Sequence, residues 1–285
     1  MSDASTISAE PAQRREAGAR EALIGVAQAF LTAVEAHDPS RAPLASGFRM
    51  TENAVDCAAG EGLWGRVTQF ASRQFLVDAV AGQVMVFGAV TCSDALFPYA
   101  IRLAISGGQI AEVEAMVSPS ARGHFADVDQ LLKPDVLYDA PVPDERGCGS
   151  RERLKDVGDS YWTALNESDG SLASFNHRCD RYGNGKKITN SLELLLSPDA
   201  AVHTPASLIT ATRPARPQVV ERRFPILDVA RGVCGSIAIV EFGKNKDRPD
   251  VGAFYIFSIV KVVDDEIRNI DHLHAILPAG TRSSW

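Results

Sequence analysis

The chain reads REALIGVAQAFLTAVEAHDPSR over residues 20–41 and RERLKDVGDSYWTALNESDGSL over residues 151–172. Aligned without a gap, the two stretches share eight residues, and the same register reaches one further pair: Arg20/Arg151, Glu21/Glu152, Leu23/Leu154, Val26/Val157, Thr32/Thr163, Ala33/Ala164, Asp38/Asp169, Ser40/Ser171 and Asn53/Asn184. An internal repeat of this length predicts two domains of one fold. It also allows a functional site to survive in only one of the copies.

Length and composition fit two domains and exclude some partners. The 285 residues, 45% of them hydrophobic, suffice for two domains of about 130 residues that each bury a core. A formal net charge of −7 gives no attraction to nucleic acid or anionic lipid. The longest apolar runs are shorter than the roughly 20 residues that cross a bilayer. We therefore expect a cytoplasmic protein without nucleic-acid or membrane partners, whose five scattered cysteines are buried thiols.

Each copy shows helical spacing first and strand-like segments afterwards. In the first copy we expect helices at residues 20–35 and 62–70, and then strands at 73–78, 82–90, 98–105 and 109–117. The corresponding strands of the second copy are 222–228, 235–242, 253–263 and 266–277. This order predicts an α+β domain in which N-terminal helices pack on a curved antiparallel sheet.

The domain boundaries follow from this reading. We predict a disordered polar tail at 1–19, a first domain at 20–135, a linker at 136–150 and a second domain at 151–285. The second copy carries about 19 extra residues between Gly185 and Glu221. Their proline-rich part, residues 203–217, is expected to be a lid or wall over the second domain rather than a new element.

Four stretches of the chain resemble a known fold family: AHDPSRAPLASGFRMTENA (36–54), GEGLW (60–64), FNHRCDRYGNG (175–185) and ERRFPILDVARGVCGSIAIVEF (221–242). They resemble the SnoaL-like branch of the nuclear transport factor 2-like fold, in a form with two such domains in tandem. The resemblance implies two cone-shaped α+β barrels, a mostly apolar pocket inside a cone, and no cofactor. Activities in that family include dehydration, isomerisation, cyclisation and cofactorless deformylation of lignin-derived diarylpropanes, and the last is the one we favour.

The second copy holds more titratable side chains than the first. His272 and His274 share one face of the last expected strand, and Asp271 points to the other face. The first copy has Ala115 and Val117 at the histidine positions, and Phe30 where the second copy has Tyr161. We therefore expect His272, His274 and Tyr161 to transfer protons in a pocket, although a solvated strand and a core aromatic are the plainer alternatives. A full set of metal ligands is not evident, and no metal is expected.

Further candidates lie on neighbouring strands. Either Arg222 or Arg223 should face the cone and stabilise developing negative charge, unless both only pair with carboxylates at the rim. Lys261 shares a strand face with Phe257. If that face lines the pocket, Lys261 is a candidate base. If it is the outer face, both faces of the strand are apolar, which indicates a subunit interface. Tyr182 and Asn184 could line the pocket mouth, or form a structural turn.

Together these patterns predict a cofactor-independent lyase acting on a small aromatic substrate. The catalytic residues would be Tyr161, Arg222, Lys261, His272 and His274. The substrate-binding residues would be Tyr182, Asn184, Arg223, Asp271 and Phe257. The alternatives are a dehydratase, isomerase or cyclase, and a non-catalytic ligand-binding or assembly protein. A homo-oligomer formed through sheet faces is also expected.

Overall fold

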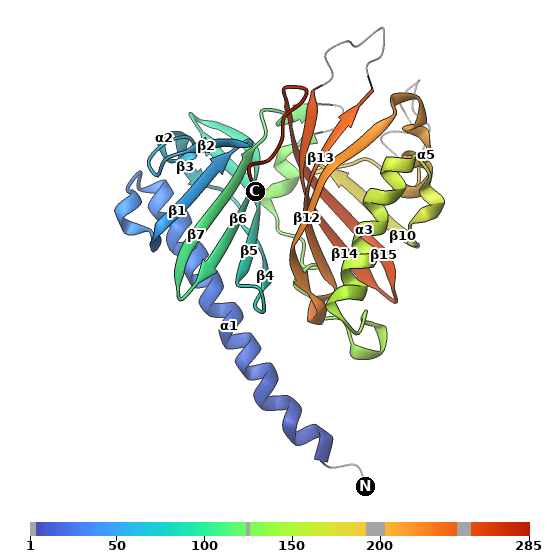
Figure 1. Cartoon of the computed structure of the whole chain (residues 1–285), viewed down its shortest axis with the longest axis horizontal. Coiled ribbons are helices and arrows are strands. Elements are labelled where there is room, and N and C mark those ends of the chain that lie inside the picture. Colours follow the sequence, from blue (N-terminus) through green and yellow to red (C-terminus); the bar gives the residue numbers. More distant parts are fainter. Residues whose placement is uncertain (1–3, 124–125, 192–202, 244–251) are drawn as a thin grey trace.

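The computed structural model describes residues 4–123, 126–191, 203–243 and 252–285. Both halves form mixed helix and strand domains with the same order of elements (Figure 1). The first domain contains α1 (Ala4–Glu35), β1 (Leu44–Glu52), β2 (Val55–Cys57), α2 (Leu63–Arg66), β3 (Val67–Phe70), β4 (Gln74–Asp78), β5 (Gln83–Cys92), β6 (Ala95–Ser106) and β7 (Gln109–Val117).

The second domain repeats this arrangement. It contains α3 (Arg151–Glu167), β10 (Phe175–Gly183), β11 (Lys186–Lys187), α5 (Pro205–Ala211), β12 (Pro217–Asp228), β13 (Val233–Phe242), β14 (Ala253–Val263) and β15 (Glu266–Leu277). Between the domains lie the short strands β8 (Arg122–Gly123) and β9 (Ala126–Asp127) and the 3-10 turn Val128–Leu132. None of the described helices is both long and apolar enough to cross a membrane.

Both large sheets are mixed, and the prediction of purely antiparallel sheets was wrong. The strand orders are β2-β1-β7-β6-β5-β3, with β4 also on β5, and β11-β10-β15-β14-β13-β12. β1 pairs in parallel with β7, and β10 pairs in parallel with β15, while the other pairs are antiparallel. β1 and β10 were not predicted, because they lie near the sheet edges and have polar, irregular patterns without clear alternation.

Three local predictions also need correction. α1 begins at Ala4, so residues 4–19 are helical rather than a disordered tail. The expected helix at 62–70 ends at Arg66, and residues 67–70 form β3. Residues 203–217 contain the helix α5, with Pro205 in its first turn and the Thr204 side chain capping its N-terminus, so this segment does form a new element.

Repeated residues occupy matching structural positions in the two copies. Asp38 and Asp169 each precede a 3-10 turn and accept a hydrogen bond from the backbone of a serine two residues later, Ser40 or Ser171. This contact satisfies a backbone N–H that the turn leaves without a partner. The repeat thus preserves a turn that directs the chain from the helix into the sheet.

The two sheets pack against each other, and each carries its first helix on the opposite face. One apolar cluster joins α1 to the first sheet and another joins α3 to the second sheet. A third cluster contains side chains of both sheets, including Met85, Phe87, Phe257 and Ile259. The outer sheet face that suggested a contact between subunits is therefore covered by the other domain of the same chain.

Candidate functional site

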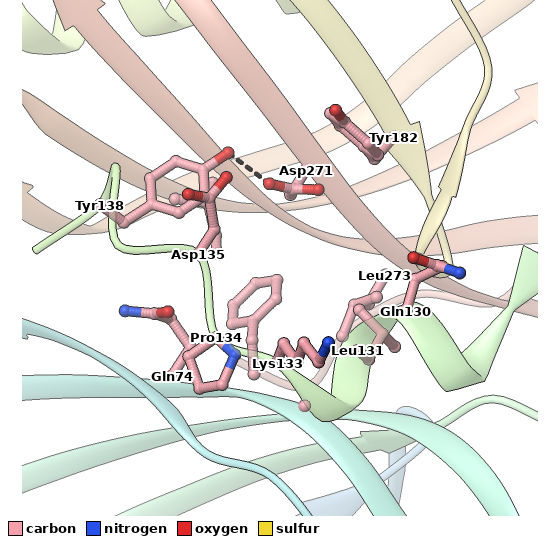
Figure 2. Close-up of a pocket in the computed structure, with 14 residues that line it drawn as sticks. Gln74, Gln130, Leu131, Lys133, Pro134, Asp135, Tyr138, Tyr182, Asp271 and Leu273 are labelled. Carbon is pink, nitrogen blue, oxygen red and sulfur yellow. Dashed lines mark hydrogen bonds between the residues drawn. The ribbon is translucent and has the colours of Figure 1, made fainter. Parts of the chain in front are cut away.

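A cavity of about 260 Å³ lies between the two domains (Figure 2). The first domain contributes Gln74 and Phe87. The segment that connects the domains contributes Gln130, Leu131, Lys133, Pro134, Asp135 and Tyr138. The second domain contributes Tyr182, Gly185, Ile259, Asp271 and Leu273. Apolar walls with a few polar groups are typical of a small-molecule site, and the volume is near the lower limit for such sites.

Asp271 is the main ionisable group of this cavity. β15 directs Asn269, Asp271 and Leu273 towards the first domain, because alternate side chains of a strand share a face. The Tyr138 hydroxyl donates a hydrogen bond to Asp271, and Asn269 Nδ2 donates to the Tyr138 oxygen over 2.8 Å. Figure 2 shows Asp271 lying between Tyr138 and Tyr182.

The environment of Asp271 prepares it for proton transfer near neutral pH. Burial raises the pKa of this carboxyl from 3.8 to about 7; the hydrogen bond from Tyr138 opposes the rise, and the charge of Asp135 adds to it. A carboxyl with such a pKa exchanges its proton readily near pH 7. Carboxyls with a pKa raised in this way occur preferentially at functional sites.

The equivalent acid of the first copy has a different environment. Glu114 takes the place of Asp271 in β7 and is fully buried at the same interface. Arg223 donates to both its oxygens, over 2.5 and 3.1 Å, and the Tyr255 hydroxyl donates over 2.5 Å. No ion pair to Asp271 is found in the described parts of the chain, so its charge is not compensated in the way that Arg223 compensates Glu114.

The C-terminal residues occupy the first copy's side of the interface. Trp285 donates from its indole N–H to Thr51, and the guanidinium groups of Arg49 and Arg102 lie over its ring. Thr51 is the counterpart of Tyr182 in the repeat. Arg102 lies opposite Glu114 on the neighbouring strand, and Ile259 lies opposite Asp271 in the same way. The interface is thus filled around Glu114 and retains a cavity around Asp271.

His272 and Tyr161 come together, but inside the second domain rather than in the cavity. Both are buried, and their rings lie 5.1 Å apart. Burial lowers the pKa of His272 well below its usual value, the charges of Arg181 and His274 add to this effect, and burial raises the pKa of Tyr161. His274 contacts Phe254, and burial and Arg181 lower its pKa to about 4. Both imidazoles are therefore neutral near pH 7.

Two of the predicted catalytic cations have structural partners instead. Arg222 faces α3, donates to Thr163 and pairs with Asp159 over 3.0 Å. Lys261 is buried and donates to the carbonyl oxygens of Ala140 and Arg231, over 2.7 and 2.5 Å. Of the two alternatives for Lys261, the structure agrees with the apolar outer face, which here meets the other domain of the chain.

The predicted substrate-binding residues divide in the same way. Tyr182 and Asp271 line the interdomain cavity. Arg223 is held by Glu114, and Phe257 packs against Phe87 in the interface core. Asn184 is fully buried, with its side chain bonded to the backbone of His274 and to Ser118, so it is part of a turn rather than of a pocket mouth.

Three residues that line the cavity were not predicted: Tyr138, Asp135 and Gln74. Two of them, Asp135 and Tyr138, fall at the boundary with the expected linker, whose only signal was the apolar run 136–138 among proline and aspartate residues. Arg181, which contacts both Tyr161 and His272, was not predicted as a site residue either. Across the described ranges, no group of three or more His, Cys, Asp or Glu side chains is placed to hold a metal ion.

Comparisons with known proteins identify a family for both halves. The family described as "Domain of unknown function (DUF8021)" matches residues 14–117 and 148–274, one stretch in each domain. No curated protein matches the chain. A solved structure of a de novo designed protein with a curved β-sheet is similar at 17% identity, covering 36% of this chain and 90% of its own, with a TM-score of 0.31. Since the family match extends over most of the sequence, the chain belongs to the DUF8021 family.

Proposed function

We propose that this protein is a cofactor-independent enzyme that transfers protons to and from a small, largely apolar molecule in the interdomain cavity. The observation that carries this proposal is the contrast between the two equivalent acids. Glu114 forms an ion pair with Arg223, whereas Asp271 lines a cavity and has a pKa of about 7. Leaving a half-buried carboxyl without a cation costs stability, and such a cost is typical of functional positions.

In the proposed mechanism Asp271 accepts a proton from the substrate as a carboxylate and returns it as a carboxylic acid. The Tyr138 hydroxyl donates a hydrogen bond to Asp271, which fixes the carboxyl and stabilises its ionised form. Phe87, Ile259 and Leu273 supply apolar walls, and Tyr182 offers a ring that can pack on an aromatic substrate. Elimination and isomerisation both require this kind of proton transfer.

The substrate class that we propose is a small aromatic compound. A cavity of about 260 Å³ has room for one ring and a short side chain. The resemblance to SnoaL-like lyases, with their cone-shaped domains, supports a lyase and keeps deformylation of a lignin-derived diarylpropane among the reactions to test. With two rings, such a molecule would extend from the cavity towards its mouth.

The experiment is a turnover screen of the whole chain. Single-ring phenolic alcohols and a diarylpropane diol would be incubated with the protein, and products, including formaldehyde, measured by mass spectrometry. For any compound that reacts, Asp271→Asn should lower kcat by at least about 100-fold, because a general acid or base contributes this much. Asp129→Asn, at an exposed ion pair with Arg122, is the matched control and should leave kcat unchanged.

Full turnover by Asp271→Asn would reject Asp271 as the acid or base. Binding of screened compounds at the cavity without any product would favour the alternative, a ligand-binding protein. The pH profile provides a second readout. Kcat/KM of the wild-type protein should change with an apparent pKa near 7, and this inflection should be lost in Asp271→Asn.

A further inference from the structure

A second cluster of polar side chains lies inside the second domain, on the face of β15 opposite to Asp271. Tyr161 and Trp162 come from α3, Arg181 from β10 and His272 from β15. The His272 ring stacks on Trp162 with a centroid distance of 5.5 Å and an angle of 6°. The Arg181 guanidinium lies 5.7 Å from the centre of the Tyr161 ring.

The hydrogen bonds of this cluster leave donors without acceptors. Arg181 Nη2 lies 3.4 Å from His272 Nδ1. Because a guanidinium can only donate, Nδ1 accepts, and the imidazole proton is on Nε2. That Nε2–H, the Tyr161 hydroxyl and Arg181 Nε are all buried and have no hydrogen-bond partner among the residues that the structure describes. Buried donors without an acceptor are rare because they have lost their hydration without replacement.

The charge of the cluster is also uncompensated. The Arg181 guanidinium carries a positive charge, and the described chain offers it no ion pair with a carboxylate. The adjacent Asp180 lies on the other face of β10, where it pairs with Lys187 over 2.8 Å and accepts from Asn190. Asp180 is thus engaged elsewhere. The interior of the domain holds one positive charge and several unused donors.

The first copy shows that the fold does not need these polar groups. The equivalents of Tyr161, Trp162, Arg181 and His272 are Phe30, Leu31, Met50 and Ala115. All four are buried in the apolar core of the first domain. The equivalent interior is therefore filled by apolar side chains in the first domain, whereas in the second domain it holds a cation and donors without partners among the described residues.

We infer that the interior of the second domain binds a small organic carboxylate, with Arg181 as its cationic partner and Tyr161 and His272 as further donors. The in-plane N–H groups of an arginine match the two oxygens of a carboxylate. The Trp162 and Tyr161 rings supply apolar surface for the rest of the ligand. This site is separate from the cavity at Asp271 and does not depend on the function proposed there.

The test uses the full chain and three probes, formate, acetate and benzoate, at constant ionic strength. Calorimetric titration and the shift of the thermal unfolding midpoint would measure binding, with chloride and phosphate as comparison anions. We expect at least one carboxylate to bind the wild-type protein. Tyr161→Phe, which keeps the ring and removes one donor, should raise its Kd by about tenfold. Asp129→Asn, at the exposed ion pair with Arg122, should bind as the wild type does.

A triple variant makes the test decisive. Tyr161→Phe, Arg181→Met and His272→Ala together install residues that the first copy already packs in its core, and near-UV circular dichroism would verify its fold. Loss of carboxylate binding in this folded variant supports the site. Absence of carboxylate binding to the wild type, equal binding of chloride or phosphate, or unchanged binding by Tyr161→Phe and the triple variant would each overturn the inference.

Discussion

Arg151 at the start of α3 forms a two-pronged ion pair with Asp78 at the end of β4, over distances of 2.8 and 2.9 Å. The pair crosses from the second domain to the first. Its counterpart crosses in the opposite direction, because Arg20 of α1 donates to Asp228 of β12 over 3.0 Å. The first arginine of each repeat therefore binds an aspartate of the other domain. An arginine of each helix thus binds the hairpin of the other domain.

Removing one member of this contact should destabilise the whole chain. Arg151→Met leaves the Asp78 carboxylate, which is 1% exposed, buried without its cation. Breaking a buried pair in this way costs about 3–5 kcal/mol. Urea unfolding should show this loss. The control is Arg153→Met, which breaks the exposed pair with Asp265 and should cost less than about 1 kcal/mol. Equal losses in the two variants would contradict an interdomain role for Arg151.

The raised pKa of Asp271 predicts how stability depends on pH. Between its ordinary value of 3.8 and about 7, the unfolded chain has released this proton while the folded chain retains it. The folded state binds more protons, so the contribution of Asp271 to stability falls as the pH rises through this window and is constant above it. Asp271→Asn has no such titration. Its stability relative to the wild type should therefore increase from pH 4 to 7 and then level off.

Denaturant unfolding at several pH values would measure this difference, and taking the difference cancels groups that titrate alike in both proteins. A difference that stays flat from pH 4 to 7 would show that Asp271 ionises normally in the folded protein. It would remove the main support for acid or base catalysis at the cavity.

The sequence could predict much of each domain but not how the domains meet. The helical stripe of residues 23–34 and the long strands are local patterns, and both appear in the structure. Strand alternation also separated Asp271 from His272 correctly. The apolar outer face with Phe257 indicated an interface, yet a single sequence does not distinguish a second subunit from the other half of the same chain. Tyr138 illustrates the same limit, since its partner Asp271 is 133 residues away.

Lys261 should prove structural rather than catalytic. Burial lowers its pKa from 10.5 to about 8. Between these values the unfolded chain holds a proton that the folded chain has released, so the contribution of Lys261 to stability rises as the pH rises from 8 to 10.5. Lys261→Met should lack this rise and should lose about 1–3 kcal/mol at pH 7, because two carbonyl oxygens lose their donor. Turnover of a substrate found in the screen should be unchanged; a large fall in kcat with stability retained would restore its catalytic role.

The repeated asparagines allow one interaction to be compared in two environments. Asn53 and Asn184 have φ values of 49° and 43° and follow equivalent strands. Each side chain bonds to the backbone of the last strand of its sheet, at Val117 or at His274. Asn184 is fully buried and also donates to Ser118, whereas Asn53 is partly exposed.

Alanine at either position meets the same cost of a left-handed backbone, so the difference between the two variants reports burial. After Asn53→Ala, water can reach the freed backbone groups, and we expect a loss of about 1 kcal/mol. After Asn184→Ala those groups stay dry, and we expect about 2–3 kcal/mol. Thermal unfolding of both variants would measure the two losses. Similar losses would mean that water reaches the second turn as easily as the first, contrary to the packing of the connecting segment against it.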